Sequence, residues 1–271
     1  MRYCRFFFDD QIHYGLVEER GNEPWIVDFT AAPGEDLAFH LSRARASSLV
    51  PHPAGLDFEP MPLSAADLLA PVTPSKIVCV GRNYRAHAAE LGNEVPTEPL
   101  IFLKPPSSII ADGDRIVLPP QSQQVEYEGE IGVVMGTRAH HVSESDAANA
   151  ILGICAVNDV TARDLQKSDK QWTRAKGFDT FCPIGRTHEY HGDLSTLTVV
   201  TRVNGIERQR GTSDLMVFAI PRLVAFISSV MTLEPGDIIA TGTPEGVGRL
   251  SSGDVVEVEV VGMSHVRSTV A

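Results

Sequence analysis

The chain has 271 residues, of which 43% are hydrophobic and 21% are charged, and its formal net charge is -12 at pH 7. This length is enough for one large domain with a full hydrophobic core, or for such a domain with a small companion. The negative charge argues against nonspecific binding to nucleic acid or to an anionic membrane surface. The composition is ordinary for a globular enzyme.

Residues 1–70 have the pattern of a small β-rich domain. Short strands are predicted over residues 3–8, 12–17 and 25–29, and a short helix over residues 35–44. Prolines at positions 51, 53, 60, 62 and 71 then indicate a linker, because proline interrupts regular hydrogen bonding. No catalytic pattern is found in this part. We therefore expect the chemistry to lie in a second domain, residues 71–271.

Hydropathy and cysteine spacing favour a cytoplasmic protein. No segment reaches the roughly 18 consecutive apolar residues that a membrane-spanning helix requires. The apolar residues 6–8 precede Asp9 and Asp10 and are too few for a signal peptide. The cysteines are widely separated and form no C-x-x-C pair; they are Cys4, Cys79, Cys155 and Cys182. We expect reduced, mostly buried thiols.

The segment 125–136 contains three glutamates at alternate positions and then continues into an apolar run. On a β-strand Glu126, Glu128 and Glu130 would lie on one face. Like charges this close must protonate or bind a cation. Carboxylates without nearby Cys or His suit Mg²⁺, with Mn²⁺ or Ca²⁺ possible and zinc disfavoured. The alternative is an edge strand with a solvated acidic face, against which the apolar run 131–135 argues.

A further carboxylate and a group of cations follow the next predicted strand. Asp159 comes directly after the buried-strand pattern of residues 153–157, which is a suitable position for a third ligand. Several cations lie downstream, namely Arg163, Lys167, Lys170, Arg174 and Lys176. Such a local excess would attract an anionic substrate in an otherwise acidic protein. A solvated basic helix face is the alternative, and it suits Lys167 and Lys170 better than Arg163 or Lys176.

A histidine and a glutamate are spaced to share one helix face in the segment 82–90. His87 and Glu90 stand at positions i and i+3. A histidine oriented by a carboxylate is typical of general-base catalysis, although a solvated surface pair has the same spacing. Lys104 ends the apolar run 100–103, where it points into a cleft or extends along the surface.

The other predicted elements complete the second domain. Helices are predicted over residues 144–152 and 214–231, the second with a break at Pro221. A hairpin with its turn at Asn204 and Gly205 is predicted over residues 197–209. The loop Thr241-Gly242-Thr243-Pro244 follows a short strand and suits a carboxylate or phosphate. It lacks the lysine of a P-loop, which disfavours nucleotide binding. His188 and His191 are interpreted as surface residues.

Taken together, these motifs resemble the fumarylacetoacetate hydrolase superfamily in its two-domain bacterial form. The segments that carry the resemblance are Gly81-Arg82-Asn83-Tyr84 with His87 and Glu90, Phe102-Leu103-Lys104-Pro105, Tyr127-Glu128-Gly129-Glu130, residues 158–164, Ala175-Lys176 and Thr241-Gly242-Thr243-Pro244. The resemblance spans roughly residues 76–260. It implies an α+β, β-rich fold, in which a mixed β-roll catalytic domain follows a small N-terminal β-rich domain, and a homodimer.

The resemblance also implies roles for individual residues. Glu128, Glu130 and Asp159 match the family's Mg²⁺ or Mn²⁺ ligands, and Glu126 matches none of them. His87 and Glu90 resemble the dyad that activates water, with Lys176 as a further catalytic residue. The positions implied to contact the substrate are Lys104, Arg163, Gln166 and Thr243.

The implied reaction acts on a small anionic keto acid through a metal-stabilised enolate. Our first expectation is hydrolysis of a carbon–carbon bond in an acylpyruvate or fumarylacetoacetate-like acid. Decarboxylation, keto–enol tautomerisation or double-bond isomerisation of a related acid is the alternative, because each uses the same kind of enolate. A different hypothesis is that the protein is not an enzyme and only binds metal.

Overall fold

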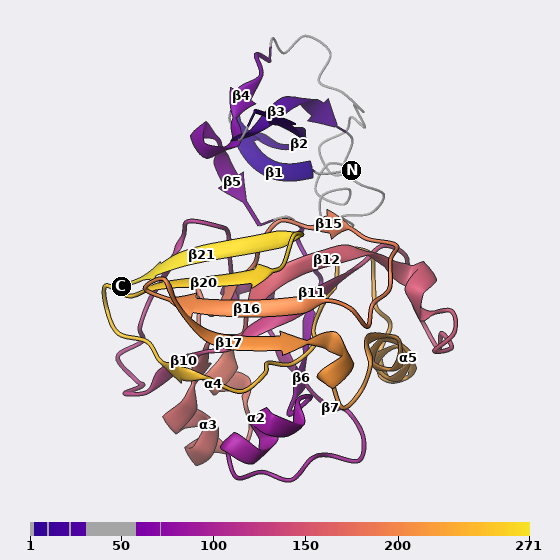
Figure 1. Ribbon diagram of the computed structural model, residues 1–271, viewed down its shortest axis with the longest axis vertical. Coiled ribbons are helices and arrows are strands. Elements are labelled where there is room, and N and C mark those ends of the chain that lie inside the picture. Colours follow the sequence, from indigo (N-terminus) through magenta and orange to yellow (C-terminus); the bar gives the residue numbers. More distant parts are fainter. Residues whose placement is uncertain (1–2, 10, 22, 31–57, 71) are drawn as a thin grey trace.

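A computed structural model describes residues 3–9, 11–21, 23–30, 58–70 and 72–271. The first part of the chain forms a five-stranded antiparallel sheet, in the order β4-β3-β2-β1-β5. Its strands are β1 (Tyr3–Phe8), β2 (Gln11–Arg20), β3 (Glu23–Thr30), β4 (Met61–Pro62) and β5 (Asp67–Leu69), with a 3₁₀ turn at Leu63–Ala65. Figure 1 shows this sheet at one end of the molecule's long axis. The three strands predicted before residue 30 are confirmed.

An aromatic cluster forms the core of this small sheet. The rings of Phe6 and Phe29 stack with centroids 6.0 Å apart, and Phe58 lies 4.7 Å from Phe29. The predicted linker is wrong at Pro62, because Met61–Pro62 pairs with β3 and belongs to the sheet. Pro60 lies directly before this strand and outside regular structure. The predicted helix at residues 35–44 and the prolines at 51, 53 and 71 lie outside the described residues.

A six-stranded mixed sheet is the centre of the larger unit. Its order is β15-β12-β11-β18-β6-β7. The strands are β6 (Ile77–Gly81), β7 (Leu100–Lys104), β11 (Gly129–Met135), β12 (Ile151–Asn158), β15 (His188–Glu189) and β18 (Ile238–Ala240). All seven residues of β11 are buried, as the apolar run in the sequence predicts for a strand covered on both faces.

A five-stranded sheet packs against one face of this central sheet, and Figure 1 shows its long strands in front. Its order is β17-β16-β20-β21-β9. The strands are β9 (Arg115–Ile116), β16 (Thr198–Val203), β17 (Ile206–Thr212), β20 (Val255–Val260) and β21 (Ser264–Val270). The predicted hairpin turn is confirmed, since Asn204 and Gly205 both have positive φ, at 53° and 76°.

Alternation along the central strands divides the core into two layers. Ile131, Val133 and Met135 of β11 pack with the five-stranded sheet and with helix α5 (Ile220–Val230). Val134 faces the opposite layer together with Cys155 of β12. Because successive side chains point to opposite faces, one buried strand stabilises both layers.

Short elements surround the end of the central sheet farther from the N-terminal sheet (Figure 1). They include the helices α2 (Arg85–Glu90), α3 (Arg163–Asp169) and α4 (Thr173–Lys176), and a small sheet of β10 (Val125–Tyr127), β13 (Thr161–Ala162) and β19 (Gly248–Arg249). A parallel pair is formed by β8 (Ile109–Ile110) and β14 (Cys182–Pro183). A 3₁₀ turn at Pro106–Ser108 precedes β8.

Two predicted helices differ from those in the structure. Residues 144–152 contain a 3₁₀ turn at Ala147–Ala150, after which β12 begins at Ile151. In the second region a 3₁₀ turn at Ser213–Leu215 is separated from α5, and Pro221 lies in the first turn of α5. Proline lacks the amide hydrogen, which the first turn of a helix does not need, so Pro221 starts this helix instead of breaking it.

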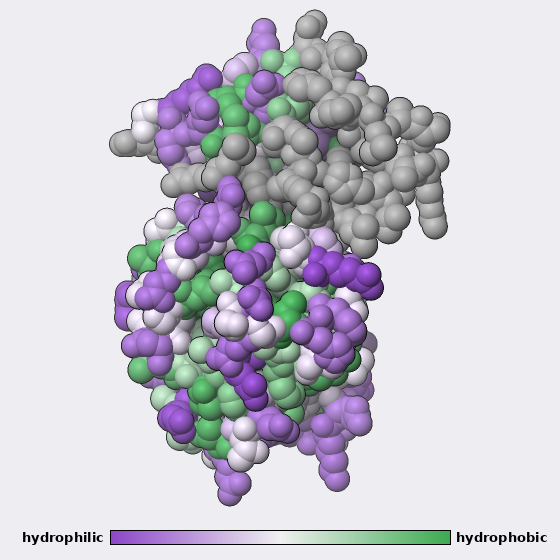
Figure 2. All heavy atoms as spheres, turned by 90° about the vertical axis from the view of Figure 1, so that its right-hand side faces the viewer, coloured by the Kyte–Doolittle hydropathy of each residue, from purple (hydrophilic) through white to green (hydrophobic). Residues whose placement is uncertain are grey.

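All four cysteines are buried and free, as predicted. Burial raises the pKa of the Cys4 and Cys182 thiols to about 12, so both remain protonated. Among the described residues, no helix combines the length and apolar character needed to cross a bilayer. Figure 2 shows polar and apolar residues intermixed over the face of the larger unit on which α5 lies.

Candidate active site

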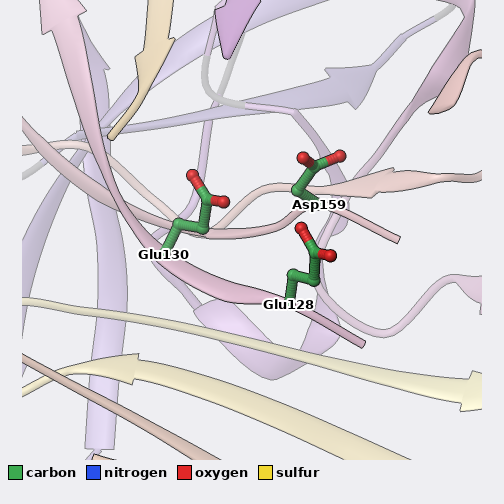
Figure 3. A group of neighbouring side chains, drawn as sticks. All are labelled: Glu128, Glu130 and Asp159. Carbon is green, nitrogen blue, oxygen red and sulfur yellow. The ribbon is translucent and has the colours of Figure 1, made fainter. Parts of the chain in front are cut away.

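Three carboxylates meet where the central strands β11 and β12 lie side by side. These strands are antiparallel and pair Gly129 with Asn158, so the start of β11 lies next to the end of β12. Glu130 is in β11, Glu128 directly precedes it, and Asp159 directly follows β12. Their ligand oxygens all lie within 4.8 Å of one another (Figure 3). The predicted convergence of acidic residues from two neighbouring strands is therefore present.

Backbone hydrogen bonds hold this junction together. The amide of Asp159 donates to the Glu128 carbonyl at 2.8 Å, and the amide of Glu128 donates to the Asn158 side-chain oxygen at 3.0 Å. All three carboxylate side chains are almost completely buried. They are consequently positioned by the sheet and not by a mobile loop.

Glu126 does not share the face of the other glutamates, so the prediction of one continuous acidic strand face is wrong. The strand is interrupted at Glu128, and Glu126 belongs to β10 in a different sheet. Its carboxylate accepts hydrogen bonds from Arg163 Nε at 2.7 Å and from the Gln124 amide at 2.6 Å. Glu126 therefore contacts the site only through Arg163.

Three buried cations balance most of the negative charge. Lys176 Nζ lies 2.8 Å from Glu128 and 2.6 Å from Asp159, and Lys104 Nζ lies 2.6 Å from the other oxygen of Asp159. Arg163 binds Glu128 as well as Glu126. Four carboxylates against three cations leave one negative charge in excess. Glu130 is the carboxylate without a cation, and it accepts the Gly242 amide at 2.7 Å.

The two glutamates of this group have opposite pKa shifts. Burial disfavours ionisation of Glu128, but Lys176 and Arg163 outweigh it and hold the Glu128 pKa well below its usual range. Burial also raises the pKa of Glu130, and Asp159 and Glu128 raise it further by repulsion. The Lys176 pKa is raised because Asp159 and Glu128 outweigh the effect of burial, so this ammonium group stays charged.

The three carboxylates fit a hard divalent cation. The donor set consists of oxygen atoms alone, as Mg²⁺ and Mn²⁺ prefer. With all four carboxylates ionised the group would have one uncompensated negative charge, and burial together with Asp159 and Glu128 raises the pKa of Glu130. A divalent cation between these oxygens would remove both penalties.

A cavity of about 430 Å³ opens beside the carboxylates. Of the predicted catalytic and substrate-contacting residues, those on its wall are His87, Glu90, Arg163, Gln166, Lys176 and Thr243. Lys104 is not on this wall. Its ammonium lies behind Asp159, where it also donates to the Val160 carbonyl at 3.1 Å. Lys104 therefore orients a carboxylate in this structure, and its contact with a substrate stays a prediction.

The histidine and glutamate of α2 face the cavity as a pair. His87 Nδ1 lies 3.3 Å from Glu90 Oε2. Glu90 is held in turn by the amide of Gly246 at 3.0 Å, and the carbonyl of Gly246 accepts the Tyr127 hydroxyl at 2.9 Å. Gly246 has φ +96°, and a Cβ there would meet the Arg208 carbonyl oxygen at 2.1 Å, so this contact requires glycine.

Asn83 fixes the segment from which α2 starts. Its buried amide group donates to the carbonyls of Thr241 at 2.7 Å and Phe218 at 3.1 Å, and its side-chain oxygen accepts the Phe218 amide at 2.8 Å. These bonds connect the end of β6 with the loops after β18 and before α5. They position α2 over the cavity.

The remaining predicted substrate contacts have partners within the protein. Gln166 accepts a hydrogen bond from Arg163 at 2.7 Å through its side-chain oxygen. The Thr243 hydroxyl donates to the Gly129 carbonyl at 2.9 Å and accepts from the Gln209 amide at 2.7 Å. Gln166 therefore keeps its amide hydrogens for a ligand, whereas the Thr243 hydroxyl is already used.

The wall also has residues that were absent from the predicted site, among them Arg82, Phe102, Lys167 and Trp172. The rings of Trp172 and Phe102 meet edge to face with centroids 5.0 Å apart. A Cβ at Gly81 would lie 2.8 Å from the Trp172 ring, so the glycine makes room for the indole. Gly81 in the Gly-Arg-Asn-Tyr motif was the only sequence signal for this close contact.

Comparison with known proteins identifies the family. A profile described as "Fumarylacetoacetate (FAA) hydrolase C-terminal" matches residues 76–271. The chain therefore belongs to the fumarylacetoacetate hydrolase family, and the small N-terminal β domain precedes the mixed β catalytic domain of that family.

Similar proteins are named for several different activities. The mitochondrial oxaloacetate tautomerase FAHD2A of Bos taurus is 39% identical over 265 residues, which are 92% of this chain and 84% of that protein. A solved 5-carboxymethyl-2-hydroxymuconate delta-isomerase from Mycobacterium smegmatis is 39% identical with a TM-score of 0.82, covering 100% of this chain and 98% of its own. A fumarylpyruvate hydrolase from Pseudomonas aeruginosa, solved with Mn²⁺ and pyruvate, is 29% identical with a TM-score of 0.69, covering 73% and 90%.

Proposed function

We propose that this protein is a divalent-metal-dependent tautomerase or isomerase that interconverts the keto and enol forms of a small 2-keto acid, with oxaloacetate as the first candidate. The observation that carries the proposal is that the metal-competent carboxylates and the His87–Glu90 pair line one cavity. The relatives named as a tautomerase and an isomerase match nearly the whole chain and support this direction over hydrolysis.

In this proposal Glu128, Glu130 and Asp159 hold Mg²⁺ or Mn²⁺, and Ca²⁺ would suit the same oxygens. When bound, the ion polarises the keto oxygen and stabilises the negative charge that develops on it. The manganese in the solved fumarylpyruvate hydrolase supports this choice of metal. Arg163, Lys104 and Lys176 keep the carboxylates ionised and oriented, because each donates to at least one of them.

Enolisation of a 2-keto acid removes a proton from the carbon next to the keto group. His87 takes this proton through the ring nitrogen opposite Nδ1, since Nδ1 faces Glu90. Glu90 orients the ring and stabilises the imidazolium that forms. Lys176 provides a permanent positive charge beside the reacting oxygen, and the amide hydrogens of Gln166 bind the acid.

Hydrolysis of an acylpyruvate or fumarylacetoacetate-like acid is the second candidate. The same His87–Glu90 pair can activate a water molecule, and a fumarylpyruvate hydrolase shares the fold over 73% of this chain. Decarboxylation of oxaloacetate would use the same enolate. The three reactions differ in their products.

Product analysis by NMR and mass spectrometry with Mg²⁺ present tests the proposal. We expect accelerated keto–enol interconversion of oxaloacetate without change of mass, and loss of this activity in His87→Asn while Mn²⁺ affinity is retained. Two acids formed from an acylpyruvate would instead identify a hydrolase, and released CO₂ a decarboxylase. A protein that binds the metal but converts none of these acids would be the non-catalytic alternative.

From the family resemblance we also propose that the protein is cytoplasmic and forms a homodimer. Light scattering on the purified protein would measure its subunit number.

A further inference from the structure

The cavity wall has four cations, of which two are paired with carboxylates of the site. Arg163 and Lys176 are engaged by the inner carboxylates. Arg82, at the end of β6, and Lys167, on α3, also line the cavity. Within the described part of the chain, neither has a side-chain hydrogen bond or ion pair. Arg82 is half-buried and Lys167 is exposed, so they lie toward the outer part of the wall.

The backbone at Arg82 is in a conformation that arginine rarely adopts. Its φ is +58°, in the left-handed region that favours glycine. The neighbours on both sides are fixed, because Gly81 lies against Trp172 and Asn83 is anchored by its buried hydrogen bonds. The arginine side chain is therefore held at the cavity by rigid flanking residues. Such unfavourable backbone conformations concentrate at functional sites.

The inner charges limit what the inner end of the cavity can bind. Arg163 donates from its three nitrogens to Glu126, Glu128 and Gln166, and Lys176 lies between Glu128 and Asp159. The positive charges of both cations are thus already paired with carboxylates of the protein, which weakens their attraction for a second negative group on a ligand. A ligand with two carboxylates consequently needs separate cationic partners for the outer one.

We propose that Arg82 and Lys167 form a subsite for the distal carboxylate of a dicarboxylic keto acid. This inference rests on the proposed function and adds its substrate class: the protein selects dicarboxylates over monocarboxylates of the same length. Arg82 supplies a planar pair of donors that matches a carboxylate, and Lys167 adds a point charge. The cavity of about 430 Å³ accommodates a short diacid with one carboxylate at each end.

The test compares two acids that differ only in the distal group. Oxaloacetate and 2-oxobutanoate are assayed for enolisation, by enol absorbance and by deuterium exchange at C3. Arg82→Met should lower kcat/KM for oxaloacetate about 10-fold or more, mainly through KM, and leave exchange of 2-oxobutanoate unchanged. Lys167→Met should have a smaller effect of about 3-fold, because an exposed ion pair is weaker. Arg82→Lys should recover part of the oxaloacetate preference.

Matched controls remove nearby charges that do not line the cavity. The controls are Arg85→Met and Lys170→Met. Arg85 lies on α2, Lys170 directly follows α3, and both residues are exposed. Both controls should behave as the unaltered protein does. Equal losses on both acids for Arg82→Met, or equal losses in Arg85→Met, would overturn the subsite. Methionine keeps an unbranched Cβ at position 82, so the backbone cost is unchanged.

Calorimetry with non-reacting analogues separates this inference from the proposed function. Malate and 2-hydroxybutanoate are titrated into the Mg²⁺-loaded protein. Malate that binds more tightly than 2-hydroxybutanoate, with this difference lost in Arg82→Met, supports the subsite. If the protein shows this binding but does not tautomerise oxaloacetate, only the proposed function fails. Malate binding no tighter than that of 2-hydroxybutanoate in the unaltered protein overturns the subsite, whatever its activity.

Discussion

At Glu128 a single buried carboxylate accepts both Arg163 and Lys176 while facing Asp159 and Glu130. Removing one member of a buried ion network leaves the others unpaired, which makes each residue here important for both charge balance and ligand geometry. Glu126 is the useful contrast, because it has the same chemistry, contacts the same arginine and lies outside the carboxylate triad.

Glu128→Gln and Glu126→Gln form a matched pair for metal binding. We expect Glu128→Gln to weaken Mn²⁺ binding by about 100-fold or more, since it removes a ligand, and Glu126→Gln by about 10-fold or less, since it acts through Arg163. Calorimetric titration with Mn²⁺ measures both. Similar losses in the two variants would place Glu126 among the ligands or remove Glu128 from them.

Tyr127 is a positioning residue that acts on the dyad through Gly246. Tyr127→Phe removes the hydroxyl that holds the Gly246 carbonyl. We expect kcat to fall several-fold, while KM and Mn²⁺ affinity stay unchanged. The free energy of unfolding should fall by about 1 kcal/mol. Tyr190→Phe is the control, because its hydroxyl donates to Asp193 in an exposed loop. An equal kcat in Tyr127→Phe and the unaltered protein would contradict this role.

Among the elements, β6 and β18 are the pair whose ends carry the cavity loops. They run parallel from Ile77 and Ile238, and the chain after each contributes wall or anchoring residues. Asp237, which directly precedes β18 and is completely buried, joins the starts of the two strands. Its carboxylate accepts the amides of Ser75 at 2.8 Å, Lys76 at 3.1 Å and Glu234 at 2.8 Å, and it pairs with the Lys76 ammonium.

Asp237→Ala tests how far this anchor stabilises the pair. Several buried or half-buried donors would lose their acceptor, and we expect a loss of about 3–5 kcal/mol in the free energy of unfolding by urea. Asp193→Ala, which removes an acceptor for Ser195 in an exposed turn, should cost about 1 kcal/mol or less. A small loss of unfolding free energy in Asp237→Ala would mean that strand pairing alone holds the starts of β6 and β18 together.

At the scale of the whole molecule, the carboxylate group couples folding to pH and metal. The raised pKa of Glu130 stabilises the metal-free fold at low pH, and this contribution is lost as pH rises through the folded-state value, above the ordinary value of about 4.3. The lowered pKa of Glu128 acts in the opposite sense, so its contribution is present at neutral pH and lost as pH falls below about 4.3.

Metal binding should therefore release a proton from Glu130. We expect the rise in Tm caused by Mg²⁺ to be larger at pH 8 than at pH 6, and calorimetry in buffers of different ionisation enthalpy to show proton release. Removal of the metal with EDTA should return Tm to the metal-free value. A Mg²⁺ effect that is independent of pH would contradict the shifted Glu130.

The sequence alone was sufficient to predict strands 3–8, 12–17 and 25–29, the hairpin at Asn204 and Gly205, and the apolar run of β11. These features are local, because side-chain alternation and turn preferences act over a few residues. The carboxylate group was predicted only in part, because alternation placed Glu126 on one face with Glu128 and Glu130. The strand end indicated Asp159, and the family resemblance implied the set Glu128, Glu130 and Asp159, whose oxygens the structure brings together. The predicted helix over residues 144–152 is instead a 3₁₀ turn at Ala147–Ala150, and its last two residues belong to β12.

Only the tertiary structure decided which side chains reach the cavity. Glu126 leaves the acidic group because its strand pairs in another sheet, and Lys104 lies behind Asp159 although its motif resembles a substrate contact. Arg82 and Lys167 line the cavity without side-chain partners among the residues that the structure describes, which depends on a left-handed residue after β6 and on where α3 packs. Such directions are set by register and by contacts between segments far apart in the chain, which local periodicity does not encode.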